Sequence, residues 1–339
     1  MYKAALLRKA AVETSRRLTL PRVSTIYYRK AFVYKRNIFL QLNKIKKAGG
    51  TAMKNDKITR QKKKDIMTDL NKKLEWLYKN TSHNVIWIAL FGSQNYEMDL
   101  NTEEYRSDID AKAVCIPSMR ELLRDEKLVS KVYKLEDGSQ IEVKDIRLFI
   151  RTLKKQNPSY LETLFTKYYI CDERFKKVLD MADDIALADR KRLFKSILGM
   201  ICQKKKNIDK SFGSNEGRCV GYGYDPKEMS NIARLYFLSC DLILRKKTLR
   251  EALVPDECYK KTCIDYKVNP VDVNTAFLES NKFFIASKKM IENYLKNEFS
   301  VDVECYNKLD NVVLSLLEDS LKNELKNGTN NSETLMHMH

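Results

Sequence analysis

The chain has 339 residues, of which 43% are hydrophobic and 32% are charged, and its net charge at pH 7 is +18. This length suggests two domains and is enough to bury a core without disulfides, and the hydrophobic share is near the globular average, which excludes wholesale disorder. Only three histidines occur, at positions 83, 337 and 339. This small number argues against Ser-His-Asp and Cys-His active sites and against histidine-rich zinc sites. We expect any catalysis to depend on carboxylates and a metal ion, with His83 in a loop.

Most of the positive charge lies in residues 1–52. This segment contains thirteen Lys and Arg residues and a single acid, Glu13, so it carries +12 and the rest of the chain carries +6. Three interpretations stay open. The segment is a basic extension, disordered or outside the native protein with Met53 as the initiator; it is an arm that binds nucleic acid; or, being rich in Arg and poor in acids, it is a mitochondrial presequence.

Eight cysteines occur without a C-x-x-C pair. The closest two, Cys258 and Cys263, have no matching second pair, which argues against a zinc site. No apolar run approaches the ~18 residues of a membrane span. We therefore expect reduced cysteines, a cytoplasmic location and no membrane partner.

The first predicted elements alternate between helix and strand. Apolar residues at three- and four-residue spacing predict a helix over 58–80, and a continuous apolar run predicts a buried strand over 85–91. A polar loop over 94–106 and a second strand over 107–116 follow. A helix is expected over 118–129.

A hairpin and more helices complete the pattern. Asp137-Gly138 is a turn signal between strands over 132–135 and 139–143. Asp145 is expected to cap a helix that Asn157-Pro158 ends. Beyond residue 174 the apolar stripes are helical. The prediction is an α+β fold, divided into a small mixed sheet with flanking helices at 53–180, a helical domain at 181–325 and a disordered tail at 326–339.

Gly92 and Ser93 follow the first predicted strand directly. Glycine lets the backbone approach an anion closely, and exposed backbone N–H groups with a serine hydroxyl can hold a phosphate. A Gly-Ser turn alone is most often an ordinary turn. It indicates a phosphate site only in combination with the carboxylates described next.

Asp108 and Asp110 stand at the start of the second predicted strand. Residues i and i+2 of a strand share a face, about 6.6–6.8 Å apart, where two carboxylates repel each other and are costly to desolvate. A divalent cation removes both penalties, and Mg²⁺ prefers oxygen ligands. Glu142, in a third strand, adds a third acid, with Asp145 as its rival. Three carboxylates can hold two metal ions for an in-line phosphoryl displacement.

The stretch F-G-S-Q-N-Y…S-D-I-D…I-E-V resembles the signature of the DNA polymerase beta-type nucleotidyltransferase superfamily. Residues 144–165 and 222–235 resemble segments of its YcgL-like predicted nucleotidyltransferase branch, so the resemblance covers about 85–240. It implies a polymerase-beta-like core followed by a helical domain. It also implies triphosphate binding by Gly92 and Ser93, and metal ligation by Asp108, Asp110 and Glu142.

The resemblance extends to residues of the helical part. It implies nucleotide contacts by Lys227 and Tyr224, and it gives Tyr224, Asp225 and Arg234 a part in placing the helical unit against the site. The branch carries histidines after the lysine where this chain has Glu228 and Asn231, which puts its substrate choice in doubt. Glu162 is expected to be a solvated or capping acid.

The sequence thus predicts a nucleotidyltransferase. It would transfer a nucleoside monophosphate from an NTP such as ATP to an RNA, protein or small-molecule acceptor, with two Mg²⁺ ions, or Mn²⁺ in their place. The alternative is a non-catalytic protein that binds nucleic acid through the basic arm.

Overall fold

The computed structural model describes residues 52–100, 107–124 and 127–336, with side chains only within residues 62–326. The chain divides into two compact units, residues 1–62 and residues 63–339. Residues 1–51 lie outside the described part, so the three interpretations of the basic segment stay untested. The features below belong to the second unit and to helix α3 (Ala52–Asn80), which begins in the first.

Five strands form one mixed sheet in the order β3-β4-β2-β1-β5. Their bounds are β1 (Asn84–Phe91), β2 (Asp110–Ile116), β3 (Ser130–Lys134), β4 (Gln140–Asp145) and β5 (Tyr169–Cys171). β1 pairs with β2 and β5 antiparallel, β3 pairs with β4 antiparallel, and β2 pairs with β4 parallel. The predicted strands over 85–91, 107–116 and 139–143 are therefore neighbours in space, and the hairpin at Asp137-Gly138 is confirmed.

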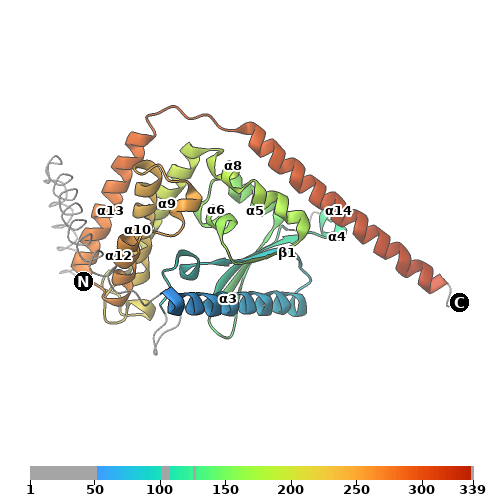
Figure 1. Ribbon diagram of the computed structural model, residues 1–339, viewed down its shortest axis with the longest axis horizontal. Coiled ribbons are helices and arrows are strands. Elements are labelled where there is room, and N and C mark those ends of the chain that lie inside the picture. The colour runs from blue at the N-terminus through green and yellow to red at the C-terminus, as the bar shows by residue number, and fades with distance from the viewer. Residues whose placement is uncertain (1–51, 101–106, 125–126, 337–339) are drawn as a thin grey trace. The chain divides into compact units, whose positions relative to one another are not determined.

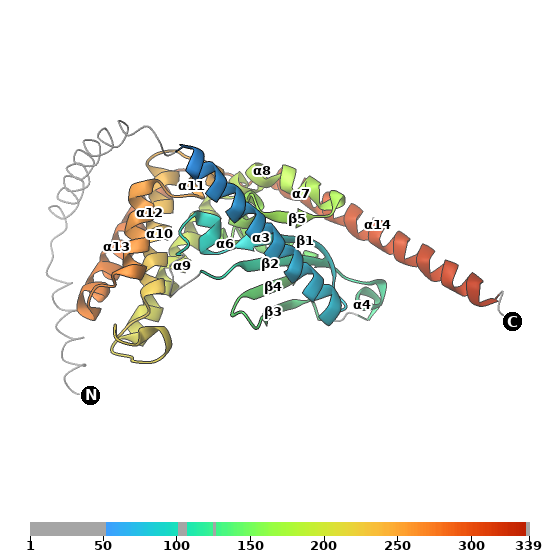
Figure 2. The ribbon, with the colours of Figure 1, turned by 60° about the horizontal axis from the view of Figure 1, so that its bottom comes forward.

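Helices cover both faces of this sheet (Figure 1). Because side chains alternate along a strand, Ile88, Ala111 and Ala113 point to one face, where they pack against Leu70 and Leu77 of α3. Figure 2 shows α3 running across that face. The opposite face carries Trp87, Val114 and Ile116, which pack in a larger core with α5 (Ile146–Lys154) and the helices that follow it.

The rest of the chain is helical. Its remaining helices are α4 (Met119–Leu123), α6 (Pro158–Leu161), α7 (Lys176–Asp180), α8 (Ala182–Leu187), α9 (Arg190–Ser211), α10 (Pro226–Ile243), α11 (Leu249–Ala252), α12 (Glu257–Val268), α13 (Val273–Tyr294) and α14 (Val303–Met336). The larger core runs from the sheet through these helices, with the exception of α4, which buries no residue in it. A small mixed sheet followed by a helical region confirms the predicted fold class, while the domain boundaries stay predictions.

Several local expectations differ from the structure. The second strand begins at Asp110 and not at residue 107, and the helix predicted over 118–129 is only α4. The polar stretch after β1 is not an open loop, because a 3₁₀ turn (Ser93–Tyr96) buries Gln94 and Asn95. β5 was not predicted; it has only three residues. α14 continues to Met336, through most of the predicted tail.

Two expectations from composition can be compared with the structure. All eight cysteines are free thiols, and five of them are buried. Within the described residues no helix is long and apolar enough to cross a membrane.

Candidate active site

Gly92 and Asp110 meet where β1 ends and β2 begins. Phe91 pairs with Asp110 across the two strands, and Gly92 follows with φ 93° and ψ −158°. That positive φ disfavours any residue with a side chain. A Cβ at position 92 would lie 3.7 Å from Oδ2 of Asp110. The missing side chain therefore leaves bare backbone beside a carboxylate oxygen. Phosphate binding by this turn stays a prediction.

Ser107 anchors the segment that delivers the carboxylates. Its N–H donates to the carbonyl of Leu100 at 2.8 Å, and its hydroxyl accepts from the Leu100 N–H at 2.8 Å. Its carbonyl accepts from the side-chain amide of the buried Gln94 at 3.2 Å. Leu100 and Ser107 are thus tied together immediately before Asp108, and Gln94 of the turn after Gly92 is tied to the same place.

Asp110 is the half-buried member of the carboxylate pair. Its Oδ1 accepts a hydrogen bond from the Gln140 N–H at 3.1 Å. Burial raises the pKa of Asp110, and the charge of Asp108 adds to the rise, while the Gln140 N–H, Lys227 and Lys73 lower it. Asp108 precedes the strand and is exposed. The structure therefore brings both Asp108 and Lys227 within electrostatic reach of Asp110.

Lys227 approaches the carboxylates from the first turn of α10. Asp225 caps this helix by accepting from the Lys227 N–H at 2.9 Å. A second cation, Lys267 near the end of α12, donates from Nζ to the carbonyl of Met98 at 3.3 Å. Burial, and next the charge of Lys227, lower the pKa of Lys267 to about 8. Lys227 and Lys267 are thus neighbouring ammonium groups, and the charge of Lys227 also acts on Asp110.

Sequence reasoning missed Lys267, although a signal was present. The residue lies one turn after Cys263, which is fully buried on α12. A lysine on the buried stripe of a helix must find a carbonyl, a carboxylate or an external anion as its partner. Lys73 was missed in the same way: it sits on the buried stripe of α3 at 2% exposure, paired with Asp69 at 2.5 Å.

Glu142 lies on the same face of the sheet as Asp110 but has different neighbours. It is level with Lys112 across the β2–β4 pair, and its carboxylate pairs with Lys112 at 3.5 Å and Lys144 at 3.1 Å. The Tyr160 hydroxyl also donates to it. Burial alone would raise the pKa of Glu142, but Lys112, the Tyr160 hydroxyl and Lys144 together hold it below its usual value.

Asp145 is a helix cap in this structure. Its side chain accepts from the Arg147 N–H at 2.8 Å and pairs with the Arg147 guanidinium at 2.6 Å. It is 2% exposed and three residues along β4 from Glu142, which turns it to the other face. Asp145 is therefore not placed to join Asp110.

Asp108 and Asp110 suit a metal ion better than Glu142 does. Within the described residues no group of three or more His, Cys, Asp or Glu side chains is arranged to hold a metal ion. Asp108 and Asp110 suit Mg²⁺ by chemistry, since they offer carboxylate oxygens at an accessible edge beside Gly92. Ligation by Glu142 as the third acid stays a prediction.

Tyr224, expected to contact the nucleotide, and Arg234, expected to help place the helical unit, are both buried. Tyr224 is fully buried in the helical core, and this burial raises its pKa to about 12. Its position fits packing and not contact with a nucleotide. Arg234 pairs with Glu162 at 2.6 Å, and Glu162 also accepts from the Tyr96 hydroxyl at 2.9 Å. The expectation of a solvated or capping Glu162 is wrong, because the side chain is 0% exposed.

Comparison with known proteins gives only distant similarities. No family model matches the chain, and no curated protein does. A nucleotidyltransferase-like protein from Exiguobacterium sibiricum is similar in structure at 8% identity and a TM-score of 0.26, over 67% of this chain and 75% of that one. The CD-NTase CdnG of Bradyrhizobium diazoefficiens, solved in complex with GTP, is similar at 11% identity and a TM-score of 0.18, over 66% and 91%. Both similar structures are described as nucleotidyltransferases or nucleotidyltransferase-like. At these low scores, the function has to be argued from the side chains of the site.

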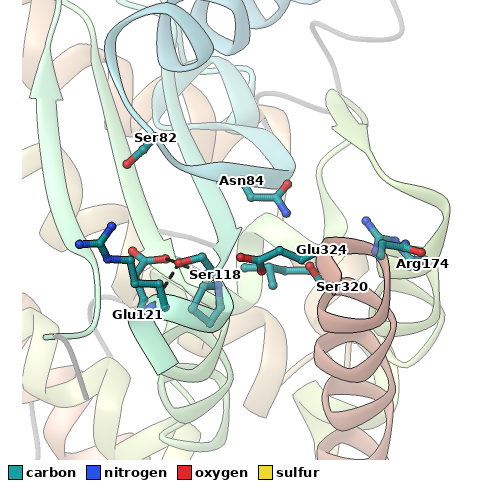
Figure 3. Close-up of a pocket in the computed structure, with 11 residues that line it drawn as sticks. Ser82, Asn84, Ser118, Glu121, Arg174, Ser320 and Glu324 are labelled. Atoms are coloured by element: carbon teal, nitrogen blue, oxygen red, sulfur yellow. Dashed lines mark hydrogen bonds between the residues drawn. The ribbon is translucent and has the colours of Figure 1, made fainter. Parts of the chain in front are cut away.

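A cavity of about 720 Å³ lies away from these side chains. It opens between the start of β1, α4 and α14, where Asn84, Ser118 and Glu324 line it (Figure 3). Asn84 pairs with Ile116 at the end of β2 opposite to Asp110, which is about 20 Å away at ~3.3 Å per residue. None of the predicted site residues lines this cavity, so it does not carry the carboxylate chemistry.

Proposed function

We propose that this protein is a metal-dependent nucleotidyltransferase that transfers a nucleoside monophosphate from an NTP to an acceptor and releases pyrophosphate. One observation carries the proposal: the side-chain-free backbone of Gly92 is held beside Oδ2 of Asp110. Asp108 and Lys227 lie within electrostatic reach of the same carboxylate. A glycine turn, two carboxylates and an opposing lysine are the groups that a metal-bound triphosphate needs.

Each of these residues has a defined task. The Gly92 turn gives a phosphate room to approach the backbone, with the Ser93 hydroxyl as a donor. Asp108 and Asp110 would hold Mg²⁺, or Mn²⁺, which when bound neutralises triphosphate charge and lowers the pKa of an acceptor hydroxyl. Lys227 and Lys267 offset the remaining negative charge of the triphosphate from the helical side.

Metal-dependent nucleotide binding tests this assignment. Calorimetric titration with a non-hydrolysable NTP analogue should give binding to the wild-type chain that requires Mg²⁺. The Asp108→Asn/Asp110→Asn variant should lose at least tenfold in affinity, which is about 1.4 kcal/mol. Asp137→Asn is a matched control, because this acid caps the β3–β4 turn through Ser139. Equal affinities with and without Mg²⁺ would remove the basis of the proposal.

The alternative function rests on the +12 charge of residues 1–52. A nucleic-acid binder that works through this arm alone needs neither metal nor NTP, and its affinity falls steeply with salt. The acceptor class of the transferase (RNA, protein or small molecule) stays open. The two functions are compatible if the arm delivers an RNA acceptor.

A further inference from the structure

Lys112 is a buried ammonium group in the middle of the sheet. It lies between Ala111 and Ala113 on β2 and is only 3% exposed. Its Nζ lies 4.0 Å from the centre of the Phe91 ring and 3.6 Å from that of Tyr160. It donates to the Ser159 carbonyl at 2.9 Å. A charge buried to this degree is tolerated only with an anionic partner.

Glu142, whose side chain is 30% exposed, supplies that partner. Its Oε2 lies 3.5 Å from Lys112 Nζ. Its Oε1 accepts from Lys144 Nζ at 3.1 Å and from the Tyr160 hydroxyl. Both oxygens of the carboxylate therefore already have positively charged or hydroxyl donors. The group is one carboxylate with two ammonium ions, so its formal charge is +1.

A divalent cation at Glu142 would meet this excess of positive charge. To bind there it must displace the lysines, and Lys112 has no solvent to enter, since aromatic rings and α6 cover it. Removing the anion from a buried ammonium leaves an uncompensated charge, which is strongly destabilising. The lysines and the cation thus compete for one carboxylate, and burial favours the lysines.

Asp110 differs in each of these respects. Its Oδ1 has one neutral partner, the Gln140 N–H. Its Oδ2 faces Gly92, and among the residues that the structure describes it has no hydrogen-bond partner. The neighbouring acid Asp108 adds negative charge. A cation at this end of β2 therefore gains two carboxylates without displacing an ion pair.

We infer that the site holds a single divalent cation, at Asp108 and Asp110, and that Lys112 and Lys144 provide the positive charge at Glu142 in place of a second ion. Glu142 is then a positioning residue: through Lys112, Lys144 and Tyr160 it fixes α6 to the sheet. The inference rests on the proposed function, and it replaces the two metal ions predicted from the sequence with one.

The first test counts bound ions on the full-length wild-type chain. Mn²⁺ and a saturating non-hydrolysable NTP analogue are equilibrated across a dialysis membrane, and the excess of Mn²⁺ over nucleotide-only solution in the protein compartment is counted per chain. One Mn²⁺ per chain is expected. Two ions per chain would overturn the inference, and this measurement requires no variant to fold.

The second test separates Glu142 from Asp110. Glu142→Gln should keep the Mn²⁺ affinity of the wild type within twofold while lowering Tm, because Lys112 loses its anion. Asp110→Asn should lose at least tenfold in Mn²⁺ affinity. A tenfold loss in Glu142→Gln would show that Glu142 is a ligand and would overturn the inference. Unchanged affinity in both variants would overturn the location at Asp110, and the proposed function with it.

Discussion

Arg234 and Glu162 form an ion pair at 2.6 Å with side-chain exposures of 7% and 0%. The Tyr96 hydroxyl donates to the other Glu162 oxygen at 2.9 Å, and the Arg234 guanidinium lies 4.1 Å from the centre of the Tyr96 ring. Arg234 stands seven residues after Lys227 on α10, which is close to two helical turns and the same side. The pair therefore fixes the turn after Gly92 relative to the helix that carries Lys227.

Removing one partner of the Arg234–Glu162 pair should lower the stability of the protein strongly. We expect Glu162→Gln to lower the free energy of unfolding by about 3–5 kcal/mol, because Arg234 is left buried without its anion. Urea unfolding followed by circular dichroism measures the change. The control is Glu318→Gln, whose partner Lys322 is 3.8 Å away with both side chains 66% exposed. That variant should lose about 0.5 kcal/mol or less, and equal losses in the two variants would contradict the importance of burial.

Asp110→Asn should stabilise the metal-free protein. Burial raises the pKa of Asp110 in the folded state, so the folded chain binds more protons than the unfolded chain as the pH passes from the unfolded to the folded value. Ionised Asp110 therefore costs stability at neutral pH, and asparagine removes this cost. Tm at pH 7 should rise in the variant, and the gain should disappear once the pH is below the unfolded pKa.

Asp137→Asn, in the β3–β4 hairpin, should destabilise the protein, in contrast to Asp110→Asn. The side-chain hydrogen bond from Ser139 lowers the pKa of Asp137, so ionised Asp137 adds stability above its unfolded pKa and loses it as the pH falls through the folded value. Its variant should have a lower Tm at pH 7. A fall in Tm for both variants would contradict the assignment of Asp110 as a destabilising carboxylate.

Lys267 should make stability rise with pH. Its folded pKa of about 8 lies below the ordinary value of 10.5, so between these values the unfolded chain binds more protons and the folded state gains stability as the pH rises. From pH 7 to pH 9 the gain is about 1 kcal/mol. Lys267→Met should lack this part of the rise, as urea unfolding at the two pH values can show. An identical pH profile in both proteins would contradict the assignment.

Nucleotide binding should also be linked to a proton at Lys267. A triphosphate favours the charged amine, so binding near pH 8 should take up protons in the wild type. Calorimetry in buffers with different ionisation enthalpies measures this uptake. Lys267→Met should take up fewer protons, whereas uptake equal to that of the wild type would place Lys267 away from the phosphates.

Deletion of residues 1–52 separates the two proposed functions. The arm carries +12, so its removal should weaken binding to single-stranded RNA and reduce the slope of log affinity against log salt concentration. Mg²⁺-dependent NTP binding should stay within twofold, because the carboxylates and lysines of the site lie beyond residue 62. Fluorescence anisotropy with labelled RNA measures the first effect. Loss of NTP binding upon deletion would contradict the division of roles.

Local sequence patterns predicted the strands of the site because short stretches of sequence determine these strands. The apolar run before Gly92 forms β1, and its pairing with β2 places Gly92 beside Asp110. The Asp137-Gly138 turn joins β3 to β4 as a hairpin, and β4 in turn pairs with β2. A continuous hydrophobic strand, a glycine turn and a hairpin each specify structure over fewer than a dozen residues.

The partners of buried charges could not be predicted in the same way. Arg234 is 72 residues from Glu162 in the chain, and Lys112 is 30 residues from Glu142. No local pattern identifies such pairs, so Glu162 was expected to be a solvated or capping acid and Glu142 to be free for a metal ion. The available signal was the Ala111-Lys112-Ala113 run inside a strand, because a lysine in a buried strand requires a nearby carboxylate.

Transfer of a labelled nucleotide tests the carboxylate site most directly. The full-length chain is incubated with Mg²⁺ and each α-³²P-labelled NTP against pools of RNA, protein and small molecules, and labelled acceptors are separated from free nucleotide. The wild type should label an acceptor and release unlabelled pyrophosphate, and Asp108→Asn/Asp110→Asn, folded by circular dichroism, should not. An acceptor labelled equally by the double variant would contradict nucleotidyl transfer at Asp108 and Asp110.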